Sequence, residues 1–205
     1  MQTFAIIPAA GQSQRMGRPK LLLPWGKHTL IEHVLGAWNA SRVGRVILVV
    51  HPDNGRLAEL GSKGGAHVVR PETPPSDMKE SVRLALEFAA SFEPAPTDAW
   101  LVAPADVPGL ATTTIDRLIA GYEAAVAQEG APKRIWAPQC QGRRGHPVLL
   151  PWSLAAEVAR LAPDQGLNSL VDRGPVEYVE VAPDALGDDV DTPADYNRLR
   201  ERYGI

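Results

Sequence analysis

Short apolar runs alternate along the chain with longer stretches in which apolar residues recur at helical spacing. The runs at residues 4–7, 46–50 and 100–103 are continuous, which is typical of strands buried on both faces of a sheet. Helical spacing is found at residues 30–39, 57–60 and 78–92, and a further strand is predicted at residues 67–69. The repeated order of strand, helix and strand predicts a parallel sheet covered by helices on both faces.

The second half of the chain is less regular. A helix is predicted over residues 112–128, and two strands at residues 135–137 and 148–150 flank a turn rich in glycine and arginine. These strands either pair as a hairpin or lie apart in a mixed sheet. Short helices near residues 153–161 and 167–172, a strand at 176–181 and a final helix from 193 to about 203 complete the pattern. We predict one domain over residues 1–205 with an open three-layer α/β/α fold.

The loop after the first strand, residues 8–20 (PAAGQSQRMGRPK), has the composition of a phosphate-binding site. Gly11, with the small residues Ala9 and Ala10 before it, lets backbone amides approach a ligand closely. Arg15 and Lys20 supply positive charge beside those amides. Glycine-rich turns are common, so on its own the loop is also compatible with an ordinary turn carrying surface arginines.

Two familiar nucleotide-binding patterns are absent from this loop. Ser13 and Met16 stand where the dinucleotide pattern GxGxxG requires glycines, which makes a dinucleotide-dependent redox enzyme the least favoured interpretation. Lys20 is followed by Leu21, whereas a Walker loop has Ser or Thr there. The loop therefore predicts a phosphate site of another kind.

A carboxylate follows the strand predicted at residues 100–103. In open parallel sheets, ligands bind at the carboxyl ends of the strands, so Asp106 is expected to face the loop at residues 8–20. Mg²⁺ prefers one or two carboxylates together with substrate phosphate oxygens. The pairing of a basic loop with Asp106 is thus typical of a site for a triphosphate and its metal ion.

Composition narrows the class of protein. The net charge of -3 gives no general attraction to nucleic acid. The apolar runs are too short to cross a bilayer, so no membrane partner is predicted. The single cysteine, Cys140, cannot form an internal disulfide, which fits a cytoplasmic location.

Six motifs in a fixed order resemble the nucleotidyltransferases, and within them the MobA-like family of molybdenum cofactor enzymes, in particular its cytidylyltransferase (MocA-like) branch. The resemblance spans nearly the whole chain and implies a Rossmann-like nucleotidyltransferase fold with a mostly parallel mixed sheet. It also divides the domain into a nucleotide-binding part, about residues 1–110, and an acceptor-binding part, about residues 111–205. The motifs are PAAG with SxRMGxPKxLLP at residues 8–24, GKHTL at 26–30, Met78 with SVRLAL at 81–86, DVP at 106–108, GHPVL at 145–149 and DVDTPxD at 189–195.

The resemblance implies a role for each matching residue. Arg15, Lys20 and Asp106 would be catalytic, Asp106 and Asp191 would bind Mg²⁺, and Gly145 and His146 would bind the acceptor. The implied nucleotide-binding residues are Ala9, Ala10, Gly11, Ser13, Arg15, Lys20 and Ser81.

The reaction implied by the resemblance is the transfer of CMP from CTP to the terminal phosphate of molybdopterin, with release of pyrophosphate. A molybdenum hydroxylase that receives the product is then a candidate partner. Within the branch, Ala10 favours CTP over GTP, because its methyl group narrows the space that a purine would use. A GTP-using guanylyltransferase, a nucleotidyltransferase for a sugar phosphate or another small phosphorylated acceptor, and a non-catalytic nucleotide-binding regulator or cofactor-delivery protein remain alternatives.

One segment departs from the family pattern. Where related sequences often have Asp-x-Gly-x-Arg, this chain has DQGLN at residues 164–168, so Asn168 replaces a positive charge. This substitution leaves the acceptor open. Arg143 and Arg144, in the turn before Gly145, are expected to be solvated, with acceptor binding as the alternative.

Overall fold

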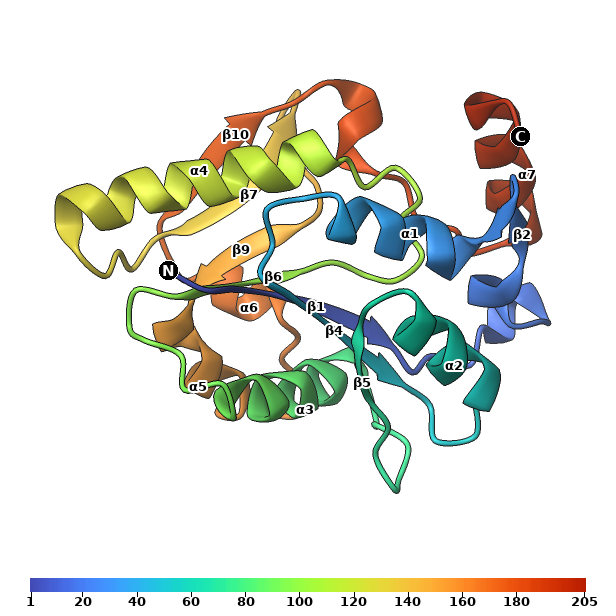
Figure 1. Cartoon of the computed structure of the whole chain (residues 1–205). Coiled ribbons are helices and arrows are strands. Elements are labelled where there is room, and N and C mark those ends of the chain that lie inside the picture. The colour runs from blue at the N-terminus through green and yellow to red at the C-terminus, as the bar shows by residue number, and fades with distance from the viewer.

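The computed structural model describes residues 1–205, except for the side chains of Gln14 and Asp184. Figure 1 shows one twisted sheet with helices packed on both of its faces. The strands of this sheet are β1 (Thr3–Ala9), β4 (Arg45–Val50), β5 (His67–Val69), β6 (Ala99–Val102), β7 (Ile135–Cys140), β8 (Arg143–Arg144), β9 (Val148–Pro151) and β10 (Val176–Glu180). The predicted α/β architecture is confirmed.

The sheet is mixed but mostly parallel. Its strand order is β10-β7-β9-β6-β1-β4-β5, and β8 pairs with β7. β9 runs antiparallel to both of its neighbours, with Trp100 opposite Leu150 and Trp136 opposite Leu149. The strands predicted near residues 135 and 148 are therefore neighbours within a mixed sheet, while the tight hairpin is formed by β7 and β8. A separate small hairpin joins β2 (Pro24–Trp25) to β3 (His28–Thr29).

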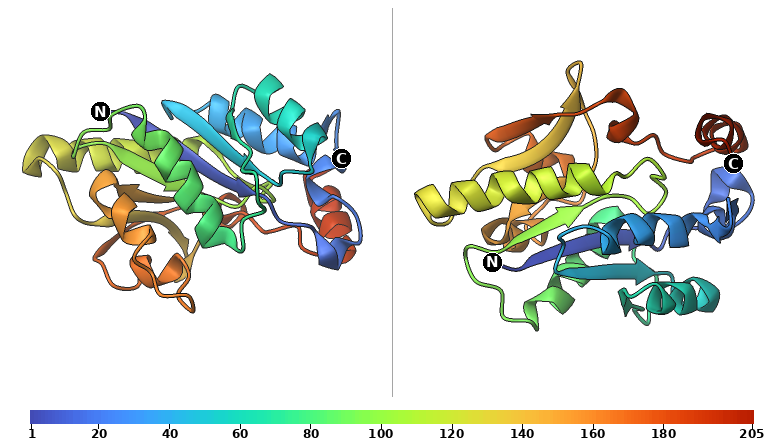
Figure 2. Two further views of the ribbon diagram at one scale, coloured as in Figure 1. Left: turned by 90° about the horizontal axis from the view of Figure 1, so that it is seen from below. Right: turned by 45° about the horizontal axis from the view of Figure 1, so that its top comes forward.

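Helices cover the two faces unequally (Figure 2). The two layers have separate apolar cores, one on each face of the sheet. On one face lie α1 (Leu30–Asn39), α2 (Gly55–Lys63), α4 (Thr112–Glu129) and, at its end, α7 (Pro193–Tyr203); on the other lie α3 (Met78–Ala90), α5 (Ala155–Val158) and α6 (Asn168–Val171).

Strand β1 shows why the predicted strands have continuous apolar runs. Phe4 and Ile6 belong to the core beneath α3, whereas Ala5 and Ile7 belong to the core beneath α1 and α4. All four residues are fully buried. Because successive side chains of a strand point to opposite faces, a strand covered on both sides needs an apolar residue at every position.

Local signals set the helix starts. Thr29 caps α1 in a reciprocal capping box with Glu32, and Asp77 caps α3 through the backbone N–H of Glu80. Thr192 caps α7 in a reciprocal capping box with Asp195, and Pro193 stands at the first helical position, as predicted. Short 3-10 helices complete the chain: Gln14–Met16, Lys20–Leu22, Trp152–Leu154 and Pro183–Leu186.

The helices predicted near residues 153–161 and 167–172 are shorter than expected. α5 and α6 each comprise one turn. Pro163 and Gly166 stand between them, and neither residue supports a continuous helix. No helix in the described part of the chain is long and apolar enough to cross a bilayer.

The strand order creates a crevice at one edge of the sheet. β1 lies between β4 and β6 and is parallel to both, so the chain leaves β1 toward one side and later returns on the other. At such a reversal the loops leaving the carboxyl ends of the strands diverge and open a ligand site. The loops at residues 10–20, 51–54 and 103–108 follow these three strands.

Candidate functional site

A cavity of about 720 Å³ opens at this edge of the sheet. It is formed by the loops that follow β1, β4, β5 and β6, together with the first turns of α3 and the segment before α7. Among its lining residues are Ala9, Ala10, Gly11, Ser13, Arg15, Lys20, His51, Ser81, Asp106, Asp189 and Asp191. Every predicted nucleotide-binding and metal-binding residue therefore lines the same cavity.

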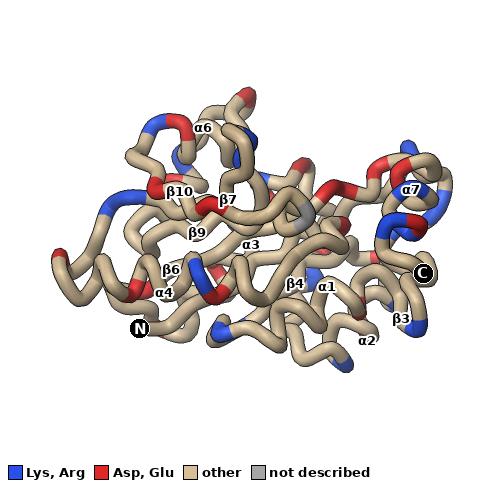
Figure 3. The backbone as a smooth tube through the Cα atoms, turned by 90° about the horizontal axis from the view of Figure 1, so that it is seen from above, with Lys and Arg blue, Asp and Glu red and all other residues tan. Residues whose placement is uncertain are grey.

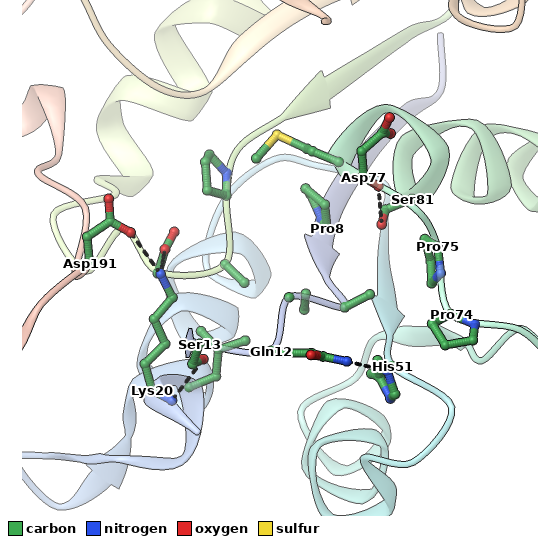
Figure 4. A pocket seen from close by; sticks show the side chains of 18 of the residues that line it. Pro8, Gln12, Ser13, Lys20, His51, Pro74, Pro75, Asp77, Ser81 and Asp191 are labelled. Carbon is green, nitrogen blue, oxygen red and sulfur yellow. Dashed lines mark hydrogen bonds and ion pairs between the residues drawn. The ribbon is translucent and has the colours of Figure 1, made fainter. Parts of the chain in front are cut away.

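Lys20 lies between the two carboxylates that the sequence assigns to a metal ion. Its Nζ donates to Asp106 and, at 3.1 Å, to Oδ1 of Asp191. Burial lowers the pKa of Lys20, but the two carboxylates raise it by more than burial lowers it. The net pKa is therefore above its ordinary value. Figure 4 shows the Lys20 side chain extended toward Asp191. The ammonium group is charged at neutral pH.

Asp106 is held in a way that leaves half of its carboxylate without a partner. Its side chain is 13% exposed, and Oδ2 accepts from Lys20. Oδ1 is buried and has no hydrogen-bond partner among the described residues. A buried carboxylate oxygen without a donor is costly, so this atom is available for a ligand that carries positive charge.

Arg15 and Asp191 form the outer part of the cluster. The guanidinium of Arg15 lies 3.0 Å from Oδ1 of Asp191 and is 71% exposed. Asp191 is placed by the segment before α7, where acidic residues follow one another along the chain (Figure 3). Because Arg15 is accessible, it can turn toward a ligand without breaking a buried contact.

The loop at residues 8–20 is shaped by its own polar groups. Ser13 has a positive φ of 53°, and its Oγ accepts from the backbone N–H of Lys20 at 3.2 Å. Met16 is buried and anchors the loop to the core. A Cβ added to Gly11 would meet no protein atom within 4 Å, so the space beside this glycine is open to a ligand. Ser13 thus positions Lys20 as well as lining the cavity.

Two other groups close the cavity away from Lys20 (Figure 4). Nε2 of Gln12 and Nε2 of His51 are 3.4 Å apart, which links the loops after β1 and β4. Ser81 is buried, and its hydroxyl donates to the backbone oxygen of Asp77 at 3.2 Å. The predicted Ser81 therefore lines the site from the first turn of α3, where its hydroxyl already has a protein partner.

Asp189 is a site residue that the residue pattern did not single out. It lines the cavity beside Asp106 and Asp191. Although Asp189 is exposed, the protein around its carboxylate partly desolvates it, and this, followed by the negative charges of these two neighbours, raises the pKa of Asp189 to about 6. The signal in the sequence was its place in the DVDTP motif, but only the tertiary structure shows that three carboxylates converge.

A second cavity of about 580 Å³ adjoins the first. Asp77, Met78, Pro104 and Asp189 line both of them. The predicted acceptor residues Gly145 and His146 line only the second. Burial lowers the pKa of His146, the Asp106 carboxylate opposes this and Arg144 adds to it, so the net pKa lies below its ordinary value. Nδ1 of His146 is buried without a partner among the described residues.

Gly145 also has a structural role, which gives a testable prediction. A Cβ at this position would stand 2.6 Å from Leu186 Cδ2 and 2.8 Å from the Leu186 backbone oxygen. We expect Gly145→Ala to displace the segment that leads to Asp189 and to lower the free energy of unfolding by about 1–3 kcal/mol. Urea denaturation measures this loss. Gly36→Ala is the control, because Gly36 is helical and a Cβ there meets nothing within 4 Å, so it should not destabilise.

Comparison with known proteins adds to this geometry. Residues 5–180 match the family described as the MobA-like NTP transferase domain. The chain belongs to this family. The predicted family membership and the general class of nucleotidyltransferase are confirmed, whereas the comparisons do not single out the MocA-like branch.

The relatives of this MobA-like transferase carry different names. Nicotine blue oxidoreductase of Paenarthrobacter nicotinovorans is 28% identical over 198 residues, which cover 95% of this chain and 94% of the relative. A 2-C-methyl-D-erythritol 4-phosphate cytidylyltransferase of Streptomyces avermitilis is 32% identical over 139 residues, which cover 64% of this chain and 52% of the relative.

A solved structure is similar over the whole MobA-like chain. Rv0371c of Mycobacterium tuberculosis H37Rv is 28% identical, with a TM-score of 0.80, and the match covers 98% of this chain and 99% of that one. The same protein was also solved as a complex with manganese, with a TM-score of 0.76 and 27% identity over 98% of this chain and 99% of that one.

Proposed function

We propose that this MobA-like transferase transfers CMP from CTP to the terminal phosphate of a molybdopterin-type acceptor and releases pyrophosphate. The observation that carries the proposal is the contact of Lys20 with both Asp106 and Asp191 in a cavity of about 720 Å³ that other residues of the loop at 8–20 also line. The alternation of cation and carboxylates fits a triphosphate with a metal ion.

The residues of the first cavity divide between the parts of the nucleotide. Ala9, Ala10 and Gly11 would contact the base and sugar through their backbone, because they line the cavity and Gly11 leaves space for a ligand. Lys20 and Arg15 would bind phosphate oxygens, since both cations lie at the same end of the cavity. Asp77, Met78, Pro104 and Asp189 line both cavities, so an acceptor in the second cavity would adjoin the nucleotide.

The residues present fit a divalent metal ion. Asp106 offers a buried Oδ1 without a donor, and Asp191 offers a second carboxylate bound to the same ammonium. The described residues contain no group of three or more His, Cys, Asp or Glu side chains arranged for a metal, so substrate oxygens would complete the coordination, as Mg²⁺ prefers. The manganese complex of the related protein supports a divalent ion. When bound, such an ion neutralises phosphate charge.

The proposed transfer needs no general base. An ionised phosphate oxygen of the acceptor attacks the α-phosphorus of CTP and forms a new P–O bond. The bond from the α-phosphorus to the bridging oxygen breaks, and its electron pair leaves with pyrophosphate. Lys20 and Arg15 hold the negative charge that develops on the phosphates, so the contribution of the protein is positioning and electrostatic stabilisation.

Base choice gives a direct test of the role of Ala10. Ala10 lines the first cavity, and its methyl group would narrow the space beside a bound base. We expect isothermal titration with Mg²⁺ to show tighter binding of CTP than of GTP, and Ala10→Gly to raise GTP affinity by about tenfold, the effect of one methylene or methyl in a pocket. Ala10→Ser, which keeps a side chain there, should retain the preference for CTP. Equal affinities in the wild type would refute the assignment of CTP.

A second candidate is an oxidoreductase activity, favoured by the similarity to nicotine blue oxidoreductase over 95% of the chain. One experiment separates the two. Purified protein is supplied with CTP, Mg²⁺ and a panel of acceptors that includes molybdopterin, methylerythritol phosphate and a sugar phosphate, and pyrophosphate is measured. Parallel samples receive a reduced nicotinamide dinucleotide and nicotine blue. Oxidation of the dinucleotide without any release of pyrophosphate would overturn the proposed transfer.

A further inference from the structure

The second cavity combines an apolar floor with a polar rim. Its floor is formed by buried residues of β6 and β9, namely Trp100, Val102, Val148 and Leu150. Apolar surfaces with a few placed polar groups are typical of sites for small molecules, and about 580 Å³ is enough for one. If the first cavity binds the nucleotide, as proposed above, the second is the place for the acceptor.

Arg144 is held on the rim of this cavity by two side chains from another part of the chain. Its Nη2 donates to Oδ1 of Asn168 at 2.8 Å, and its Nη1 donates to Oδ1 of Asp172 at 3.3 Å. Its side chain is 26% exposed, whereas that of the adjacent Arg143 is 75% exposed. The turn is therefore solvated at Arg143, as expected, but Arg144 is fixed toward the cavity.

The contacts of Arg144 leave part of its guanidinium available. Of its five N–H groups, the described residues accept hydrogen bonds from two, and the other three have no partner among those residues. A guanidinium whose orientation is already fixed loses little freedom when it binds an oxyanion, and its planar fork matches the oxygens of a phosphate or carboxylate.

The partner of Arg144 is the residue at which the sequence departs from the family pattern. Asn168 is neutral, but it accepts from the guanidinium of Arg144, so a positive charge is present beside position 168 after all. The charge comes from the β8 turn instead of from the start of α6. This exchange explains how the second cavity keeps a cation although the segment at residues 164–168 has a neutral residue where related sequences often have an arginine.

Other charged groups around the second cavity are already engaged or acidic. Nζ of Lys79 donates to the backbone oxygens of Ala162 and Pro163 at 2.8 and 3.3 Å. Asp77, Asp164 and Asp189 add carboxylates to the lining. Lys79 has one N–H left beyond these two bonds, whereas Arg144 has three, so Arg144 offers more to an anionic ligand.

Arg144 and His146 stand on the same side of the cavity, two residues apart in the chain. The charge of Asp106 raises the pKa of His146 and the charge of Arg144 lowers it, so the imidazole lies within electrostatic reach of both. His146 and Arg144 both line the second cavity, whereas Asp106 lines the first, so His146 lies between the two charged groups in their electrostatic influence.

We propose that Arg144 binds an oxyanion of the acceptor, with Asn168 and Asp172 as positioning residues for its guanidinium. The acceptor is then a molecule with an apolar body, which lies over the apolar floor of the cavity, and an anionic group that reaches Arg144. This inference rests on the proposed function for the identity of the ligand as an acceptor, but the binding site can be tested without any transfer.

The test uses phenyl phosphate as the probe, because it joins an apolar ring to an oxyanion. Binding to the full chain is followed through the indole N–H signal of Trp100 in nitrogen-labelled protein, assigned with Trp100→Phe, in the presence of saturating CTP without divalent ions. We expect Arg144→Ala to weaken binding at least tenfold, the usual effect of a lost charge-assisted hydrogen bond. Arg144→Lys should recover it only in part, because the fork is lost.

Arg143→Ala is the matched control, since Arg143 is exposed and lines neither cavity. It should leave probe affinity unchanged, and phenol, which lacks the oxyanion, should bind equally to wild type and Arg144→Ala. Asn168→Ala should weaken the probe severalfold while thermal unfolding remains cooperative. Undiminished binding to a folded Arg144→Ala protein, or an equal loss in Arg143→Ala, would overturn the inference.

The same variants separate this inference from the proposed reaction. If Arg144 binds the probe but no acceptor receives a nucleotidyl group, the proposed function fails and the oxyanion site stands. If transfer occurs and Arg144→Ala leaves the KM of the acceptor unchanged, the proposed function stands and the role of Arg144 is refuted.

Discussion

Asp106→Asn is expected to reduce the rate of pyrophosphate release by about 10³-fold or more. The substitution removes the charge of the buried carboxylate that Lys20 contacts and whose Oδ1 has no partner among the described residues. An amide oxygen retains the shape but binds a divalent cation weakly, and the loss of charge neutralisation for phosphates is worth several kcal/mol. The measurement is a continuous pyrophosphate assay at saturating CTP, together with manganese titration of the same protein.

Asp188→Asn provides the matched control for this substitution. Asp188 belongs to the same acidic segment, pairs with Arg198 and Arg202, and lines neither cavity. Its removal should change turnover by less than about threefold, because exposed ion pairs contribute about 1 kcal/mol or less. Thermal unfolding shows whether each variant is folded. Turnover retained by Asp106→Asn would remove Asp106 from the metal site.

The elements that the sequence predicted well are those set by local signals. α1, α3 and α7 begin at Thr29, Asp77 and Thr192, which accept from backbone N–H groups of their own first turns. Strand β5 has the predicted bounds, and β1 and β4 extend the predicted runs by one to three residues. In each case the spacing of apolar residues and a cap are sufficient, because the relevant contacts lie within a few residues.

The arrangement of β7, β8 and β9 could not be settled from the sequence. Apolar runs near residues 135 and 148 are compatible with a hairpin or with separate places in a sheet. The choice depends on β9 pairing with β6 as well as with β7, and β6 ends 46 residues before β9 begins. Such a partner is selected by the packing of the whole sheet, which no local pattern records.

Of the candidate site, the residues around Lys20 could be predicted from the sequence, whereas Arg144 and Asp189 could not. Motif order brought the loop at residues 8–20, Asp106 and Asp191 into one hypothesis, and the structure places them around one ammonium group. Arg144 was assigned to a solvated turn because its partner, Asn168, lies 24 residues later. The raised pKa of Asp189 likewise depends on carboxylates that meet only in three dimensions. Side-chain environment, unlike residue type, is a tertiary property.

Lys20→Met is expected to have two opposite effects. Nucleotide transfer should fall about 10²–10³-fold, the usual loss when one group that stabilises developing charge is removed. Binding of manganese without nucleotide should become tighter, because the Lys20 ammonium lies against Asp106 and Asp191 and repels a second cation there. Transfer is measured as pyrophosphate release, and metal affinity by calorimetric titration of nucleotide-free protein.

The stability of the Lys20→Met protein gives a second test of the same prediction. Lys20 and Asp106 are only 17% and 13% exposed, so removal of the cation leaves a carboxylate poorly solvated, at a cost of about 2 kcal/mol in the free energy of unfolding. Manganese should restore more of the melting temperature in Lys20→Met than in the wild type, since it replaces the missing charge. Arg15→Met is the control, because Arg15 is exposed and its ion pair among the described residues is with Asp191 alone, so it should melt like the wild type. A Lys20→Met protein with unaltered manganese affinity and normal stability would show that Lys20 and the metal ion do not share these carboxylates.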